Sequence, residues 1–185
     1  LVLAERGNRN SLRQALHIYR QLDERKRLTL QDRLVMAQLH ITLDEWSRAR
    51  TILRELLDNP TSPPSILAFG LKAMLDKGES RNIDEWVKRL ATAEPDTLRT
   101  LAIRAEYLYA NYKNSEANEL LNAATESVND NPPLATKSQV AQILVGIAEF
   151  LERSGRPVEA KVVMDRSKEL LEDELGANPA IICMR

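Results

Sequence analysis

The side chains of this chain that could carry out chemistry are few and scattered. The two histidines, His17 and His40, lack the spacing of a metal-binding pair and of an HExxH helix motif. The single cysteine, Cys183, has no neighbouring histidine that would activate it as a nucleophile. We therefore expect a protein that is not an enzyme and that holds neither a metal ion nor a cofactor.

Carboxylates and glycines are equally poor candidates for a catalytic site. The acidic run from 172 to 174 lies near the end of a predicted helix, before Gly176, with no buried partner of the kind that sets apart two catalytic carboxylates. The six glycines never gather into a loop that could cradle a phosphate group. The acidic run is typical of a solvated helix face, and nucleotide chemistry has no support.

The composition indicates a helical protein with a core. The chain has 185 residues, of which 43% are hydrophobic and only 4% are aromatic, which favours helices over a β-sandwich or β-barrel. Its 26 basic and 27 acidic side chains leave a net charge of -1, without the excess positive field that nucleic-acid binding needs. No apolar run approaches the roughly 18 residues of a membrane span. We expect neither nucleic acid nor a membrane as a partner.

The compartment is not determined by the sequence. A single cysteine cannot form an internal disulfide, which favours the cytoplasm. The chain begins at Leu1 without a methionine and ends in "ICMR", so we interpret it as a piece of a longer protein.

A period of 34 residues organises the chain. Ala49 is preceded by Ala15 and followed by Ile83 and then Ala117, each 34 residues apart, and a fifth copy follows at Ala160 after 43 residues. The positions three and four residues after these anchors are apolar in every copy, as expected for one stripe of a helix. They are Ile18, Ile52, Trp86, Leu120 and Val163, and Tyr19, Leu53, Val87, Leu121 and Met164.

A second helix is predicted before each anchor. Twelve residues before the anchors the chain carries mostly alanine or leucine, namely Leu3, Ala37, Leu71, Ala105 and Ala148. Five residues before the anchors, where the two helices must be joined, lie Asn10, Asp44, Gly78, Tyr112 and Gly155. Four of these five tolerate a left-handed backbone, so each unit is predicted to be a helical hairpin.

These columns resemble the tetratricopeptide repeat family, whose unit of 34 residues has small side chains at two helix crossings and a proline near its end. The matching residues are Ala37, Ala105 and Ala148 in the first small column, Ala15, Ala49, Ala117 and Ala160 in the second, the turn glycines Gly78 and Gly155, and the prolines Pro60 and Pro95. Pentatricopeptide and other helical-repeat families are the nearest alternatives, but an RNA-binding member would need a basic groove.

The resemblance implies an all-α fold, a right-handed superhelix or α-solenoid of about ten helices in one array. The units would span about 1–28, 29–61, 62–95, 96–131 and 132–175, and residues 176–185 would begin a further, truncated helix. Because the array would lack its end caps, the resemblance also allows two copies of the chain to associate end to end.

Some residues depart from the family's pattern. Leu71 and Ile83 replace small side chains in the third unit, and we expect them to push its two helices apart unless Gly70 provides a close approach. Tyr112 replaces a turn glycine, and Arg104 replaces a large apolar residue. The first unit retains only the end of its first helix.

The resemblance places the functional surface on a concave groove that the first helix of each unit lines. Residues seven apart share a helix face, and the strip so defined mixes both signs of charge, with Asp76 beside it. We expect it to bind a peptide or protein segment through Gln31, Gln38, Lys72, Arg99, Glu106, Tyr109, Gln142, Glu149 and Arg153. Two alternatives stay open: the strip is the solvated inner face of a spacer array, or the chain is a regulatory or substrate-recruiting module of a larger enzyme.

Overall fold

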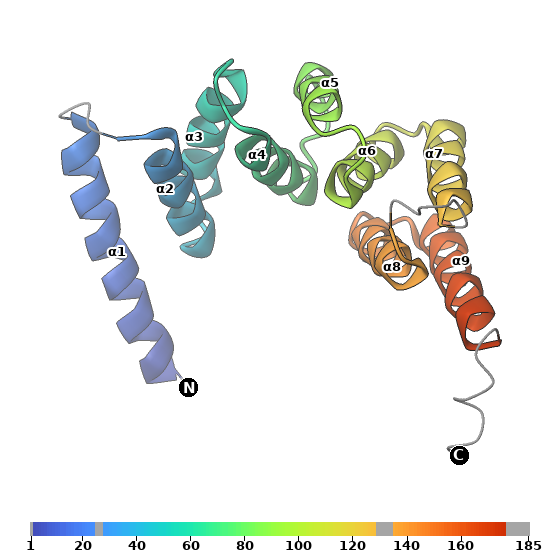
Figure 1. Ribbon diagram of the computed structural model, residues 1–185. Helices are drawn as coiled ribbons and strands as arrows, with labels where there is room; N and C mark the ends of the chain where they lie inside the picture. The colour runs from blue at the N-terminus through green and yellow to red at the C-terminus, as the bar shows by residue number, and fades with distance from the viewer. Residues whose placement is uncertain (1, 25–27, 129–134, 177–185) are drawn as a thin grey trace. The chain divides into compact units, whose positions relative to one another are not determined.

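The computed structural model describes residues 2–24, 28–128 and 135–176, and over these residues the chain forms nine α-helices and no strand (Figure 1). The prediction of an all-α fold is confirmed. The expected helix start in 176–185 lies almost wholly outside the described residues. The helices are α1 Val2–Glu24, α2 Leu30–Thr42, α3 Trp46–Asp58, α4 Pro64–Asp76, α5 Asp84–Ala93, α6 Leu98–Ala110, α7 Asn114–Ser127, α8 Lys137–Arg153 and α9 Pro157–Gly176.

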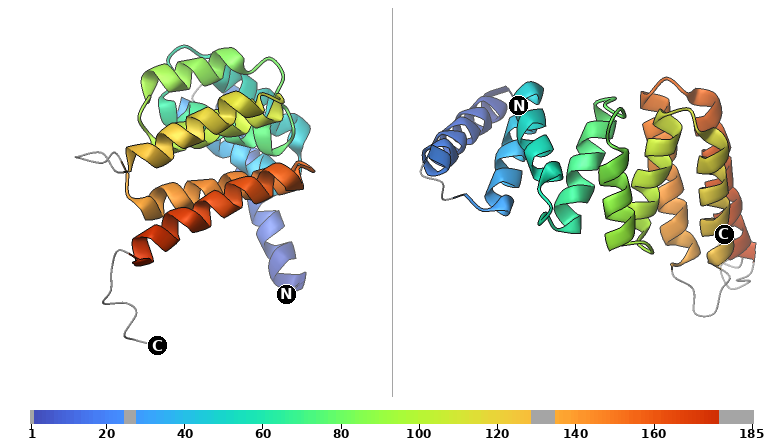
Figure 2. Two further views of the ribbon diagram at one scale, coloured as in Figure 1. Left: turned by 90° about the vertical axis from the view of Figure 1, so that its right-hand side faces the viewer. Right: turned by 90° about the horizontal axis from the view of Figure 1, so that it is seen from above.

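The chain divides into two compact units between Gly70 and Leu71, within α4. In the first unit, α2 packs closely against α3. In the second unit, α6 packs against α7 and α8, and α8 lies side by side with α9 (Figures 1 and 2). Each of the ranges 29–61, 62–95, 96–131 and 132–175 holds two consecutive helices.

The same turn joins the two helices of four hairpins. Asp44, Gly78, Tyr112 and Gly155 have φ angles of 61°, 74°, 60° and 72°. The N–H of the next residue bonds to the carbonyl five positions back in all four turns, at 2.8 Å from Glu45 to His40 and at 2.9 Å in the others. This is the Schellman motif that ends helices with a left-handed residue. The predicted turn positions are confirmed at these four places.

The start of three helices is fixed by threonine caps. The Thr29 side chain accepts a hydrogen bond from the Asp32 N–H, and the Asp32 carboxylate accepts one from the Thr29 N–H. The same reciprocal pair joins Thr136 and Gln139 at the start of α8, and Thr97 caps α6. Caps of this kind satisfy the N–H groups that a helix leaves free in its first turn. They begin the first helix of three hairpins.

The small residues of both predicted columns lie at the centres of the hairpins. Ala37, Ala105 and Ala148 of the first helices are fully buried, as are Ala49 and Ala117 of the second helices. Ala160 is 1% exposed. A methyl group at these positions lets two helix backbones come close, because there is no longer side chain to hold them apart. These columns are core positions, as the period predicts.

The hairpin of α4 and α5 is more open than the other three. Leu71 and Ile83 are both fully buried, and α4 and α5 are not among the helix pairs that pack closely. The second helix starts late, at Asp84, after a left-handed residue at Asn82 with φ 60°. The large side chains therefore keep the two helices apart, as expected. Gly70 does provide a close approach, but to Leu57 of α3, whose Cδ2 lies 3.0 Å from where a Cβ would be.

The prediction of a turn at Asn10 is wrong. α1 runs without a break from Val2 to Glu24, so residues 1–28 form one helix and not a hairpin. Asparagine costs less than about 1 kcal/mol within a helix, which is too little to break one without a glycine or proline beside it. With no hairpin partner to cover it, Ile18 of the apolar stripe is 57% exposed.

Candidate functional site: a charged cluster on α4, α6 and α8

Four charged side chains from three helices form one connected cluster in the second unit. Lys72 Nζ of α4 lies 2.7 Å from Glu106 Oε1 of α6 and 2.9 Å from Asp76 Oδ1 of its own helix. Arg153, the last residue of α8, places Nη2 3.4 Å from the same Asp76 oxygen. We call Lys72, Asp76, Glu106 and Arg153 the charged cluster. It contains three of the residues that the sequence predicts for binding, together with the Asp76 noted beside them.

Helix geometry puts these groups on common faces. Lys72 and Asp76 are four residues apart, the spacing at which side chains of one helix meet. Phe150 lies three residues before Arg153, on the same face of α8. The Lys72 ammonium lies 5.2 Å from the centre of the Phe150 ring, within the range of a cation–π contact. Phe150 is 3% exposed, so it forms an apolar floor beneath the charges.

Glu106 is the buried end of the cluster. Its side chain is 3% exposed, and Oε1 accepts a hydrogen bond from Lys72, whereas Oε2 has no hydrogen-bond partner among the described residues. Burial raises the pKa of Glu106, and the hydrogen bond from Lys72 opposes this shift only in part. Glu106 therefore holds Lys72 in place from below and is not itself a surface group.

The other three members of the cluster reach solvent. The exposed fraction is 62% for the Arg153 side chain, 38% for Lys72 and 32% for Asp76. A hollow of about 450 Å³ adjoins them. It is lined by Leu75, Asp76, Lys77, Gly78, Phe150, Arg153 and Ser154. The site thus offers charges of both signs at the edge of a hollow with an apolar floor.

Two other predicted residues lie away from the cluster. Arg99 lies at the start of α6, is exposed, and pairs with Glu94 at 2.6 Å. Glu106 of the charged cluster lies near the other end of this helix. Tyr109 is 1% exposed, and its hydroxyl donates to Asn118 Oδ1 of α7 at 2.8 Å. The structure therefore places Tyr109 in the core between α6 and α7, and we leave it out of the site.

The predicted glutamines and Glu149 lie outside the charged cluster. Gln142 and Glu149 are exposed on α8, and the Glu149 carbonyl accepts a hydrogen bond from Arg153 Nε at 3.3 Å. Gln31 is exposed and Gln38 is half-buried on α2, in the first unit. Among the described residues, no hydrogen bond or ion pair joins these four side chains to the cluster.

Arg156 joins the hairpin of α6 and α7 to the hairpin of α8 and α9. Its guanidinium donates to the backbone carbonyl of Tyr109, to Asn114 Oδ1 at 2.7 Å and to Glu159 Oε1 at 2.6 Å. It also lies 5.1 Å from the centre of the Tyr112 ring. The turn between α6 and α7 is thereby joined to the turn between α8 and α9. The hydrogen bond from Arg156 also stabilises the charged form of Glu159 and so lowers the pKa of that carboxyl group.

The sequence analysis missed Phe150. The only signal for it is its position three residues before Arg153, and an apolar residue at such a place is usually read as core. Its role under Lys72 depends on how α4 and α8 pack, and the periodicity of one helix does not contain that information.

The described residues offer no other obvious chemistry. Among them, no group of three or more histidine, cysteine or acidic side chains is arranged to hold a metal ion. No helix in the described ranges combines the length and apolar character that a membrane span needs.

The chain matches no protein-family model, no curated protein and no solved structure.

Proposed function

We propose that this chain is a protein-interaction module without catalysis of its own, which binds a segment of another protein at the charged cluster. The observation that carries the proposal is the link from Arg153 through Asp76 to Lys72 and Glu106 across α4, α6 and α8. A surface that fixes charges of both signs beside a hollow can recognise a peptide by its pattern of charge.

The repeated geometry supports a stacked array as the setting of this site. Four hairpins share one turn geometry, and their crossing positions are buried alanines or, in the hairpin of α4 and α5, larger residues. We infer that the hairpins stack as in tetratricopeptide repeats, in a right-handed superhelix whose concave wall comes from α2, α4, α6 and α8. A hairpin cannot cover its own apolar stripes, and stacking on a copy covers them.

The exposed members of the charged cluster determine which charged groups a ligand must present. Arg153 makes two long contacts, from Nη2 to Asp76 at 3.4 Å and from Nε to the Glu149 carbonyl at 3.3 Å, and its side chain is 62% exposed. Its Nη1 and Nη2 groups can therefore form two parallel hydrogen bonds with an incoming carboxylate. Asp76 can then accept from a lysine or a backbone N–H of the same ligand. We propose an extended or helical segment that presents an acidic residue to Arg153 and a donor to Asp76.

The test uses the full chain and a random-peptide display library. Peptides selected on the wild type are measured against Arg153→Glu and against the control Arg99→Glu, another exposed arginine that is paired outside the cluster. Reversal of one contacting charge is expected to weaken binding about tenfold or more. We expect that loss for Arg153→Glu and little change for Arg99→Glu. Equal affinities for both variants would contradict the proposal.

A further inference from the structure

Arg104 breaks the repeat pattern at a core position. Thirteen residues before the anchors, helices α2, α4 and α8 carry Met36, Gly70 and Ile147, all of which are buried. Helix α6 carries Arg104 at the same place, where it is half-buried. The repeat pattern therefore predicts a buried residue without charge at position 104, where the chain has an arginine.

Arg104 is not paired with any of the residues that the structure describes. Within the described part of the chain, Arg104 makes no hydrogen bond and no ion pair, in contrast to Arg153 and Arg156. Arg104 lines two hollows at the surface, so its charged group is open to an approaching ligand. An unpaired guanidinium at a repeat position that is otherwise apolar is available to pair with a group from outside the chain.

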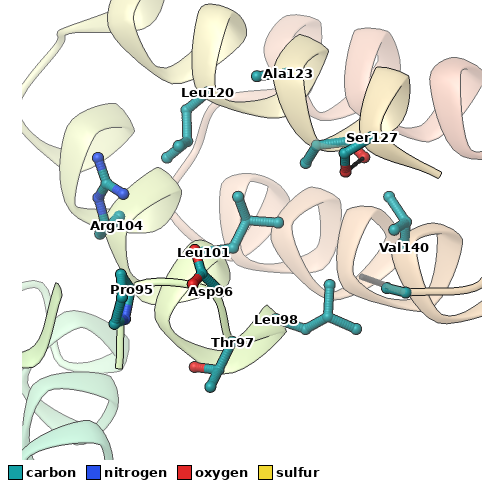
Figure 3. A pocket seen from close by; sticks show the side chains of 12 residues that line it. Pro95, Asp96, Thr97, Leu98, Leu101, Arg104, Leu120, Ala123, Ser127 and Val140 are labelled. Atoms are coloured by element: carbon teal, nitrogen blue, oxygen red, sulfur yellow. Dashed lines mark hydrogen bonds between the residues drawn. The ribbon is translucent and has the colours of Figure 1, made fainter. Parts of the chain in front are cut away.

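Two hollows meet at Arg104. One has a volume of about 240 Å³, and Figure 3 shows Leu98, Leu101 and Leu120 around it, with Arg104 at its edge. The other has a volume of about 330 Å³ and is lined on its apolar side by Val87, Leu108 and Leu120. Arg104 and Leu120 line both hollows. The guanidinium thus lies between two apolar depressions on the face built by α6 and α7.

Acidic side chains at the rims limit what can bind there. Asp96 lines the first hollow, and Glu116 and Glu119 line the second. Glu116 is paired with Lys113 at 3.3 Å, and Glu119 accepts from the Ser115 hydroxyl at 3.3 Å. These carboxylates would repel a ligand that carries many negative charges. The face therefore selects a ligand with a single carboxylate placed at Arg104.

We propose that Arg104 anchors a second binding site, which takes a peptide segment carrying one carboxylate between apolar side chains. The carboxylate pairs with the Arg104 guanidinium, and the flanking apolar side chains fill the hollows on either side of Leu120. This site uses none of the residues of the charged cluster, so it can be tested independently of the function proposed above.

The test compares the wild-type chain with Arg104→Met in the same peptide display. Methionine occupies this position on α2, as Met36, so we expect the variant to keep the fold and to remove the charge. We expect selection on the wild type to yield a class of peptides with one acidic residue between apolar residues. These peptides should bind Arg104→Met about tenfold more weakly, the loss typical of a charge-assisted pair. They should bind Arg153→Glu unchanged.

Three results would overturn this inference. The first is equal binding of the selected acidic peptides to the wild type and to Arg104→Met. The second is a selection that yields no peptides with one acidic residue between apolar residues but does yield peptides that lose affinity for Arg153→Glu. That result would contradict the second site and leave the proposed function intact. The third is a concentration-dependent dimer in sedimentation that Arg104→Met abolishes, because the occupant would then be a second copy of the chain.

Discussion

Lys72 Nζ lies 2.7 Å from Glu106 Oε1, and the two residues are 34 positions apart, one period of the repeat. They occupy the same place on α4 and α6, so the period brings equivalent positions of successive hairpins into contact. One helix provides the cation and the next provides the buried anion. This pairing fixes Lys72 beside Asp76 and orders the face that we propose as the binding site.

Replacing Glu106 by glutamine is expected to change how stability depends on pH. Burial raises the pKa of Glu106, so above the ordinary glutamate pKa and up to this raised pKa the folded chain binds more protons than the unfolded chain. The free energy of unfolding of the wild type therefore falls as pH rises through this window. Glu106→Gln lacks this contribution, so its stability relative to the wild type should increase from acidic to neutral pH.

Urea unfolding of both proteins across this pH range measures the difference. The lowered pKa values of Asp32, Glu45 and Glu159 act in the opposite direction, but they are present in both proteins and cancel in the comparison. Parallel pH profiles for the two proteins would show that Glu106 is not held in an environment that disfavours its charge.

Tyr112 is expected to be a stabilisation site. Its backbone is left-handed with φ 60°, a conformation that costs a residue with a Cβ roughly 1 kcal/mol, and its ring is 83% exposed. The contact of the ring with Arg156 offsets part of this cost. We predict that Tyr112→Gly raises the free energy of unfolding by roughly 0.5 kcal/mol.

The matched control is Gly155→Ala at the same turn position of the last hairpin, where φ is 72°. This change should lower the free energy of unfolding by about 1 kcal/mol, because alanine disfavours the left-handed conformation. Guanidinium denaturation followed by circular dichroism measures both variants. Shifts of the same sign would mean that the two turns are not equivalent.

The buried alanines are expected to resist enlargement. Ala117 of α7 is fully buried in the second small column, and a leucine there would force α6 and α7 apart. We predict that Ala117→Leu lowers the free energy of unfolding by about 2 kcal/mol. Ala123→Leu on the exposed face of the same helix should change it by less than about 0.5 kcal/mol. If thermal unfolding shows equal losses in both variants, helix crossing at Ala117 is not the cause.

Arg156 is expected to be irreplaceable by lysine. Its side chain is 12% exposed and donates to three acceptors at once, which the single ammonium of lysine cannot do in the same geometry. Arg156→Lys should lower the free energy of unfolding by about 1 kcal/mol, because partly buried acceptors lose their donors. Arg153→Lys, at a 62% exposed side chain, should change it by less than about 0.5 kcal/mol. Urea unfolding of the two variants checks the contrast.

Much of the fold can be predicted from the sequence because it repeats. The period alone locates the buried alanines Ala49 and Ala117 and the left-handed residues Asp44 and Tyr112, although tyrosine is a poor local signal for a turn. It fails at Asn10, where the column predicts a turn but nothing in the local sequence is strong enough to break α1. A repeat position is therefore informative only where a second helix is present to pack against.

The site could be predicted only in part. Lys72 and Glu106 are predicted because equivalent helix positions face the same way, and Arg153 because it lies beside that strip. The structure brings these three residues together in one cluster. Tyr109 shares that strip, yet its side chain turns into the core and its hydroxyl bonds to Asn118. Whether a residue at the edge of a stripe faces solvent or a neighbouring helix depends on packing between helices, which single-helix periodicity does not specify.

The most direct test of the central claim is a nuclear magnetic resonance titration of the isotope-labelled full chain with the strongest peptide selected on it. The proposed function predicts that the largest chemical-shift changes map to Lys72, Asp76 and Arg153, and that Arg153→Glu removes them. Changes that leave these three residues unaffected, or that persist in Arg153→Glu, would contradict the assignment of the charged cluster as the binding site.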